Sequence, residues 1–331
     1  MSNERKKITM NDIAREACVS QSTVSRVVNH YQGIKESKLR KVVAAMKKLG
    51  YEPPSVAEVS RKTVCLVICP LPEQRDILGM DFNIQVQEGV QTVLNANGVN
   101  FMLLIQSCNA DSLNLPQEKI QSISGFIFLG AVENQRILDE LESQNIPYVI
   151  AQGGMPSSAG ERCDRIAPDE FETAHLICDY LESQGRRRIG FILSRTFAHR
   201  LDGFRLEAMK RKNLRILEED IVLLDTTDKE DHIKAAYLYA SRKDLPDALI
   251  TSHHGGAVQI RSIFNFNGIR VPEDILIVSY AHTESQNQLP CVLHRAYLLG
   301  YKAARRILEK FADPDDVPCK IFIPSELINI T

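Results

Sequence analysis

Apolar residues follow two different spacings along this chain, and the change falls near residue 60. In the first fifty residues they recur at intervals of three and four, the period of a helix that packs one face against a core. Beyond residue 62 they gather in short runs that alternate with helical stretches. The pattern predicts a small helical unit followed by a larger unit of strands and helices.

The first unit has the spacing of three short helices. One can begin at Met10, and Ser20 stands just before the second, where its hydroxyl can cap free backbone N–H groups. The third spans roughly 36–49. The apolar positions expected to close a shared core are Ile13, Ala14, Ala17, Val24, Val27, Val28, Leu39, Val42, Val43, Met46 and Leu49.

The second unit has the pattern of parallel sheets that helices cover on both faces. Its strand-like runs are 63–69, 100–105, 125–130, 147–151, 188–193, 221–225, 247–252 and 274–280, with helical stretches between them. A Ser/Gly-rich break at 157–161 divides the runs into two halves, and a last helix and strand (296–311, then 319–324) follow. We expect a bilobed α/β body with a ligand in the cleft between the lobes, at the carboxyl ends of the strands.

Charge separates the two units as well. Residues 1–53 hold eleven Lys or Arg and five Asp or Glu, a formal charge of +6, although the whole chain carries −2. The outward positions of the second helix are Gln21, Ser22, Ser25, Arg26 and Asn29. Amide and guanidinium groups there suit base edges in the DNA major groove, and the charge suits phosphates. The alternative is a small helical bundle with a solvated basic face.

The N-terminal sequence resembles a known family at this point. The strings DIAREACVSQSTVSRVVN and KLRKVVAAMKKLGYEP are similar to the N-terminal domain of the lactose-repressor (LacI/GalR) family of bacterial transcription regulators. The matching residues are Asp12, Ile13, Ala14, Ala17, Val19, Ser20, Thr23, Val24, Ser25, Arg26, Val27, Asn29, Leu49, Gly50, Tyr51 and Pro53. A weaker resemblance continues to the C-terminus.

The resemblance implies a homodimeric, cytoplasmic, sequence-specific DNA-binding regulator, most often a repressor in this family. Each headpiece would read one half of a pseudo-palindromic operator, and a small ligand between the lobes would control binding. The residues expected at the DNA are Thr9, Ser20, Gln21, Ser22, Thr23, Ser25, Arg26, Asn29 and Val59. Val59 enters as the nearest apolar candidate for a minor-groove wedge, because Ser60 stands where the family has a Leu.

Three ranges follow from the pattern and the resemblance together. Residues 1–53 are expected to form the helix-turn-helix headpiece, 54–62 the hinge, and 63–331 the bilobed effector-binding and dimerisation body. Within the body, we expect lobe 1 at about 63–162 and 295–331, and lobe 2 at about 163–294. Pro54 replaces the family's Asn in the hinge, and a proline suits a first helical turn.

The resemblance also implies effector-binding positions, which we compare with this sequence one by one. In the family, an Asp opens one helix, an Arg begins an R-x-x-G-F motif, and Asn-Asp and Asp end two later strands. Asp169 and Arg200 match the first two positions. His253 and His254 stand in place of the Asn-Asp pair, and they line the expected site together with His282.

Ala281 stands where the last Asp is expected, so one acceptor for sugar hydroxyls is lost. Arg200 and the histidines supply donors instead, so we expect a small polar effector and a pocket that suits an anionic group. A metal site from His253, His254, His282 and His294 is one alternative. A degenerate pocket in an effector-independent regulator is another.

Other classes of protein fit the sequence less well. The chain has no run of 18 apolar residues, and no apolar segment follows its charged N-terminus. The glycine-rich phosphate loops, the nucleophile elbow and the H-E-x-x-H motif are missing, so no enzyme, cofactor or metal is expected. The scattered cysteines, several in strand-like runs, suit buried thiols in a reducing cytosol. A solute-binding protein would explain the body but not the basic headpiece.

Overall fold

The computed structural model describes residues 9–21, 23–24, 36–49, 62–70, 81–107, 110–130, 135–152, 163–225, 229–281 and 289–328. They belong to two compact units, whose boundary in the sequence lies between Arg61 and Lys62. Each unit has its own hydrophobic core. Within the described ranges, no helix is long and apolar enough to cross a membrane.

The N-terminal unit contains the described helices α1 (Met10–Ala17) and α3 (Glu36–Leu49). A reciprocal capping box fixes the start of α1. The backbone N–H of Thr9 donates to Asp12 Oδ2 at 2.9 Å, and the N–H of Asp12 donates to Thr9 Oγ1 at 3.4 Å. Two backbone donors that the helix cannot satisfy by itself thereby find partners.

The buried core of this unit contains six of the predicted positions, Ile13, Ala14, Ala17, Val24, Val42 and Met46. It also contains Ala45, which was not predicted. An ion pair between Lys48 Nζ and Glu16 Oε1, at 2.6 Å, joins α3 to α1 at the surface. Of the predicted second helix, residues 21, 23 and 24 are helical, and the others lie outside the described residues.

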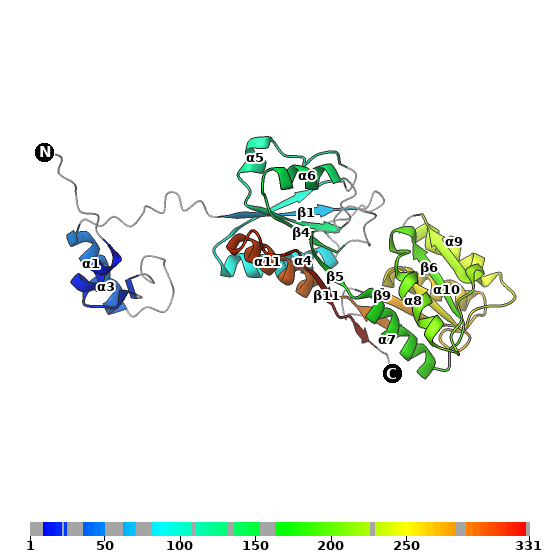
Figure 1. Ribbon diagram of the computed structural model, residues 1–331. Helices are drawn as coiled ribbons and strands as arrows, with labels where there is room; N and C mark the ends of the chain where they lie inside the picture. The colour runs from blue at the N-terminus through cyan, green and yellow to red at the C-terminus, as the bar shows by residue number, and fades with distance from the viewer. Residues whose placement is uncertain are drawn as a thin grey trace. The chain divides into compact units, whose positions relative to one another are not determined.

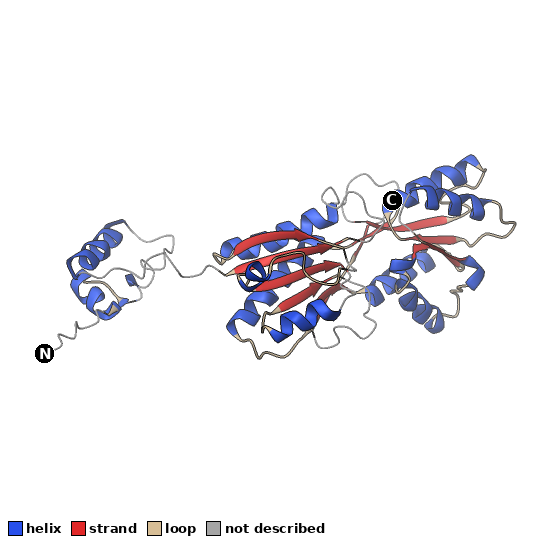
Figure 2. Cartoon of the chain, turned by 90° about the horizontal axis from the view of Figure 1, so that it is seen from above, coloured by secondary structure: helices blue, strands red, loops and turns tan. Residues whose placement is uncertain are grey.

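The first sheet of the C-terminal unit is entirely parallel, in the order β11-β5-β4-β3-β1-β2. Its strands are β1 (Thr63–Cys69), β2 (Asn100–Ile105), β3 (Gly125–Gly130), β4 (Tyr148–Ala151), β5 (Asp164–Pro168) and β11 (Lys320–Ile323). Helices α4 (Asp81–Ala96) and α11 (Ala296–Ala312) cover one face, and α5 (Gln117–Gln121) and α6 (Gln135–Ser143) cover the other (Figures 1 and 2).

The second sheet has the order β12-β10-β9-β8-β6-β7, and only β12 is antiparallel to its neighbour. Its strands are β6 (Ile189–Ser194), β7 (Ile221–Leu224), β8 (Ala248–Thr251), β9 (Leu276–Ala281), β10 (Cys291–Leu293) and β12 (Glu326–Ile328). Its helices are α7 (Glu170–Ser183), α8 (Arg200–Lys210), α9 (Lys229–Ala240) and α10 (His254–Phe266). The α7–α8 pair and the α9–α10 pair pack against separate buried clusters.

The chain passes between the two sheets at places that the apolar pattern did not predict. β5 pairs with β4 and β11 in the first sheet, although we expected residues 163–294 in the second lobe. β12 pairs with β10 in the second sheet, although we expected residues 295–331 in the first lobe. Apolar spacing identifies a strand but carries no information on which sheet edge accepts it.

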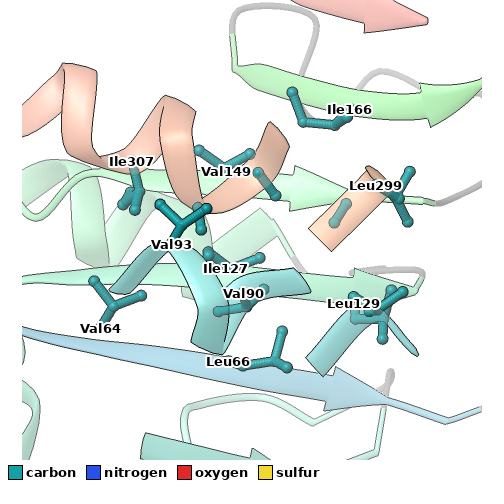
Figure 3. Packing of buried hydrophobic residues seen from close by; sticks show 14 of the residues in the cluster. Val64, Leu66, Val90, Val93, Ile127, Leu129, Val149, Ile166, Leu299 and Ile307 are labelled. Carbon is teal, nitrogen blue, oxygen red and sulfur yellow. The ribbon is translucent and has the colours of Figure 1, made fainter. Parts of the chain in front are cut away.

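Helices α4 and α11 approach each other closely on the first sheet. A Cβ at Gly300 would lie 2.0 Å from the carbonyl oxygen of Val86, and one at Gly89 would lie 2.1 Å from that of Tyr297. Only glycine allows two backbones to come this near. The apolar cluster beneath them joins both helices to the central strands (Figure 3). α11 is therefore held firmly along its length.

Candidate functional site

Three of the predicted DNA-contacting hydroxyls also stabilise helix starts. Thr9 caps α1, as described above. Ser20 Oγ lies 2.8 Å from Thr23 Oγ1 and accepts a hydrogen bond from the Thr23 backbone N–H at 3.3 Å. This capping fixes the beginning of the second helix. Gln21, next in sequence, is exposed and is available for contact with a partner.

The other predicted DNA contacts lie outside the described residues. They are Ser22, Ser25, Arg26, Asn29 and Val59. The expected hinge, 54–62, lies there too except for its last residue, Lys62. Their roles therefore stay predictions.

Arg200 is the centre of a buried polar cluster at the carboxyl end of the second sheet. Its side chain is only 3% exposed. Its Nε donates to Glu170 Oε1 at 3.1 Å, and its Nη1 donates to the backbone oxygen of Ser252 at 3.2 Å. Its guanidinium carbon lies 3.7 Å from the ring centroid of Tyr280 and 4.4 Å from that of Phe197. The carboxylate and the aromatic faces thus offset the cost of removing the guanidinium charge from water.

His294 completes this cluster, which we call the Arg200 cluster. Its Nε2 lies 4.0 Å from Glu170 Oε1, and its ring meets that of Tyr280 edge to face at 5.3 Å. Burial first, and then the positive charge of Arg200, lower the pKa of His294 well below its ordinary value of 6.5. The imidazole is therefore neutral at pH 7. The cluster combines a paired cation, a carboxylate and two aromatic rings, which suits binding rather than proton transfer.

Glu170, rather than Asp169, is the acidic partner of Arg200. Asp169 caps α7, where its Oδ1 accepts the backbone N–H of Glu172 at 2.9 Å. Its own N–H donates to the carbonyl of Ile323 at 2.9 Å. The residue-by-residue expectation identified the correct helix start but not the residue that reaches Arg200. Asp169 is the N-cap and Glu170 is the first helical residue, and it is the side chain of Glu170 that reaches Arg200.

The two adjacent histidines have other partners. His253 caps α10, because its Nδ1 accepts the backbone N–H of Gly256 at 3.0 Å, and its ring lies 4.5 Å from that of His232 on α9. His254 Nδ1 lies 3.0 Å from Ser279 Oγ. Burial lowers the pKa of His254 from 6.5. His282 lies outside the described residues.

A metal site is not supported in the described part of the chain. No group of three or more His, Cys, Asp or Glu side chains there has the arrangement of a metal site. The four histidines proposed for one include His282, which lies outside the described residues. His253 and His294, by contrast, have separate sets of neighbours.

A second polar feature lies in the first lobe, and sequence reasoning did not find it. An open hollow of about 750 Å³ is present at the carboxyl end of β2, lined by residues 105–107 and 110–116. Gln106 is buried there, and its Oε1 accepts the backbone N–H of Asn114 at 3.0 Å. The hollow is at the end of the strand where parallel α/β sheets bind ligands. A polar loop after an apolar run was the only signal in the sequence.

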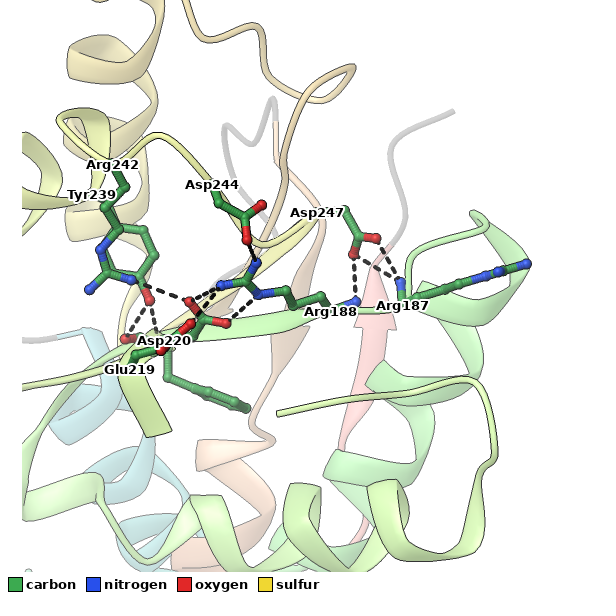
Figure 4. Close-up of polar contacts among 9 residues, drawn as sticks. Arg187, Arg188, Glu219, Asp220, Tyr239, Arg242, Asp244 and Asp247 are labelled. Atoms are coloured by element: carbon green, nitrogen blue, oxygen red, sulfur yellow. Dashed lines mark hydrogen bonds and ion pairs between the residues drawn. The ribbon is translucent and has the colours of Figure 1, made fainter. Parts of the chain in front are cut away.

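A partly buried arginine lies at the opposite end of the second sheet. Arg188 Nε donates to Asp220 Oδ2 at 2.6 Å, and its Nη1 donates to Asp244 (Figure 4). Asp247 accepts the backbone N–H groups of Arg187 and Arg188 at 2.8 and 2.9 Å. This network precedes β6, at the amino end of the sheet, so it serves folding rather than ligand binding.

Two family models match this chain. Residues 9–54 match the one described as bacterial regulatory proteins, lacI family, and residues 178–329 match the periplasmic binding protein-like domain. The HTH-type transcriptional repressor PurR of Yersinia enterocolitica is 27% identical over 97% of this chain and 95% of its own length. Catabolite control protein A of Priestia megaterium is 25% identical over 95% of each chain.

Solved structures show the same fold. The transcriptional regulator CelR in its cellobiose complex has a TM-score of 0.66 and 22% identity, over 98% of this chain and 99% of that one. The lac repressor dimer bound to operator and an anti-inducer has a TM-score of 0.66 and 19% identity, over 98% of both chains. The fold and the matched headpiece define a DNA-binding transcription regulator with a ligand-binding type of body. The chain thus contains a DNA-binding domain that matches the lacI family of bacterial regulatory proteins and a periplasmic binding protein-like domain.

Proposed function

We propose that this protein is a cytoplasmic, homodimeric repressor that releases or binds its operator in response to a small polar ligand. The observation that supports it best is the Arg200 cluster at the carboxyl end of the second sheet, in a chain whose N-terminus matches the lacI family. A ligand would act by binding one arrangement of the lobes better than another, since equal binding shifts no equilibrium.

For DNA recognition, we propose the headpiece at 1–53, with Gln21 as a base-reading residue. Exposure of its side chain beside a capped helix start supports this role. A glutamine at such a position can pair in bidentate fashion with adenine. Ser22, Ser25, Arg26 and Asn29 join it as predicted base or phosphate contacts, and Val59 in the 54–62 hinge as the predicted wedge.

For effector binding, we propose a site in the 63–331 body around Glu170, Arg200 and Tyr280. Arg200 already has an acidic partner within the chain, so its charge gives an anionic ligand less advantage than the sequence suggested. Glu170 Oε2 and the Tyr280 hydroxyl are buried without a hydrogen-bond partner among the described residues. Such groups favour a ligand that offers hydroxyl or N–H donors.

Mobility shift with genomic DNA fragments, at about 150 mM salt, tests the DNA-binding half of this proposal. We expect a few fragments to shift at concentrations at least a hundredfold below those that shift random fragments. A solute-binding protein or an enzyme would shift none of them selectively.

Thermal unfolding in the presence of neutral sugars, sugar phosphates, organic acids and nucleobases tests the effector half. A ligand at 100 times its Kd should stabilise the protein by about 2.7 kcal/mol. Tyr280→Phe removes one buried hydroxyl and should weaken that stabilisation, whereas the control Tyr237→Phe, on an exposed tyrosine, should leave it unchanged.

A second candidate is an effector-independent regulator. The burial of Arg200 and its internal partners favours it, because the guanidinium is already paired within the chain. Selective DNA binding with no stabilisation by any compound class, and no effect of Tyr280→Phe beyond folding, would support this candidate over the first.

A further inference from the structure

Lys62, the first residue of the C-terminal unit, contacts the last turn of α11 in two ways. Its Nζ lies 4.2 Å from the ring centroid of Phe311 and 3.4 Å from the backbone oxygen of the same residue. A cation is attracted both by the face of an aromatic ring and by the free carbonyls at a helix C-terminus. Both attractions act on one ammonium group.

The first sheet positions both Lys62 and Phe311. The carbonyl of Lys62 accepts the backbone N–H of Asn100 at 2.9 Å, a bond of the parallel ladder at the start of the β1–β2 pairing. A Cβ at Gly125 would lie 3.0 Å from the Phe311 ring, so the ring rests on the start of β3. The contact therefore joins the end of the linker to an aromatic ring that the sheet already positions.

The same helix reaches the Arg200 cluster by its other end. His294 precedes α11 by two residues and belongs to that cluster. A helix of 17 residues spans about 25 Å at 1.5 Å per residue. Its close glycine-mediated packing on α4 makes it a stiff element. Lys62 is thus attached to an element whose opposite end lies beside the proposed effector site.

We propose that Lys62 is a positioning residue, which fixes the point where the headpiece linker leaves the body against the C-terminus of α11. This role rests on the proposed function, because a fixed exit point has an effect only if the headpiece binds an operator. A fixed exit lowers the ordering cost of specific binding, so it strengthens affinity without contacting DNA. Nonspecific binding needs no such alignment.

The test uses the full-length protein and four variants. Lys62→Met keeps the aliphatic stem and removes the charge, Lys62→Arg keeps a cation, and Phe311→Leu removes the ring. Lys119→Met is the matched control, because Lys119 is an exposed lysine of the same lobe. Hydrogen exchange at the Asn100 amide reports on Lys62 in the free protein. Affinity for a fragment enriched from random DNA, and for a scrambled fragment, reports on positioning.

We expect Lys62→Met and Phe311→Leu each to speed Asn100 exchange and weaken specific binding by about threefold, the loss of one exposed cation–π contact. The double variant should lose no more than either single one, Lys62→Arg should retain both properties, and scrambled DNA should bind all variants alike. A loss in Lys62→Met that Phe311→Leu does not share, with a flatter salt dependence, would identify a direct phosphate contact and overturn the proposal.

The proposed function can fail separately. If the parent enriches no DNA sequence but Lys62→Met still speeds Asn100 exchange, the regulatory function is refuted, and the contact between Lys62 and α11 stands. If Asn100 exchange in Lys62→Met equals that of the parent, the positioning role of Lys62 is refuted, whatever the DNA measurements give.

Discussion

At the scale of single residues, two arginines at opposite ends of the second sheet illustrate how position decides the role of a charged side chain. Arg188 precedes β6 and is paired with two aspartates, Asp220 and Asp244, in a network that holds strand ends together. Arg200 follows the carboxyl end of β6, where loops from several strands meet, and has a single carboxylate with aromatic rings on its faces. The first arrangement suits folding, and the second suits a binding site.

Replacing the acidic partner of Arg200 should be costly. Glu170→Gln leaves a guanidinium that is 3% exposed without its ion pair, so the free energy of unfolding should fall by about 2–3 kcal/mol. Glu172→Gln, on the exposed side of the same helix, should change it by less than about 0.5 kcal/mol. Urea denaturation checks both. Equal effects of the two variants would contradict the ion-pair account.

The buried histidines should make the body sensitive to acid. The pKa values of His294, His199 and His254 are all lowered from 6.5, chiefly by burial. The unfolded chain then takes up protons first, so the stability that these groups contribute is present above about pH 6.5 and is lost as the pH falls. In His294→Gln the free energy of unfolding should fall less steeply with pH between pH 7.5 and 5.5, by up to about 1.4 kcal/mol per pH unit. Urea denaturation of the parent and the variant at both pH values measures this, and equal slopes would contradict the account.

Single residues of the site were predictable only in part. Arg200 could be selected as a candidate because it begins a recognisable R-x-x-G-F string, and most of the described headpiece core followed from helical spacing. Glu170 and Tyr280 were missed, because their roles depend on which way a helix start and a strand end present their side chains. No local pattern in a sequence encodes a guanidinium between two rings from distant segments.

At the scale of elements, α4 and α11 cross in close backbone contact. Gly89 and Gly300 face the backbone of the other helix at distances that no Cβ could occupy. Most strands were predicted closely, since buried parallel strands produce apolar runs. The short strands β5 and β10 were not among the predicted runs. Assignment of β5 and β12 to their sheets was not predicted either, because edge pairing depends on long-range topology rather than on local spacing.

Adding one methyl group at this crossing should separate the helices. Gly300→Ala would place a Cβ 2.0 Å from the Val86 carbonyl oxygen, so we expect a loss of about 3 kcal/mol in stability. Gly255→Ala serves as the control on another helix, because its nearest neighbour, the ring of His253, lies 3.6 Å away. There alanine should be neutral or stabilise by about 0.5–1 kcal/mol. Calorimetric midpoints that fall equally in both variants would contradict this reading.

At the scale of the whole molecule, charge and fold divide the protein in the same way. The basic headpiece range, 1–53, carries +6 in a chain of net −2, and the remainder is an acidic two-sheet body. A small basic module on an acidic body limits phosphate contacts to one part of the chain. The central claim is therefore that the headpiece reads a DNA sequence while the body governs when it does so.

Selection from random double-stranded DNA at about 150 mM salt tests that claim most directly. The parent should enrich a pseudo-palindromic sequence, as two symmetric headpieces require. Gln21→Ala should change the preferred base at one position of each half-site, with a loss of about 1–3 kcal/mol in discrimination, whereas Gln121→Ala, on an exposed residue of α5, should enrich the parent's sequence. Enrichment of no sequence by the parent, or of the same sequence by Gln21→Ala with equal preference, would contradict the account.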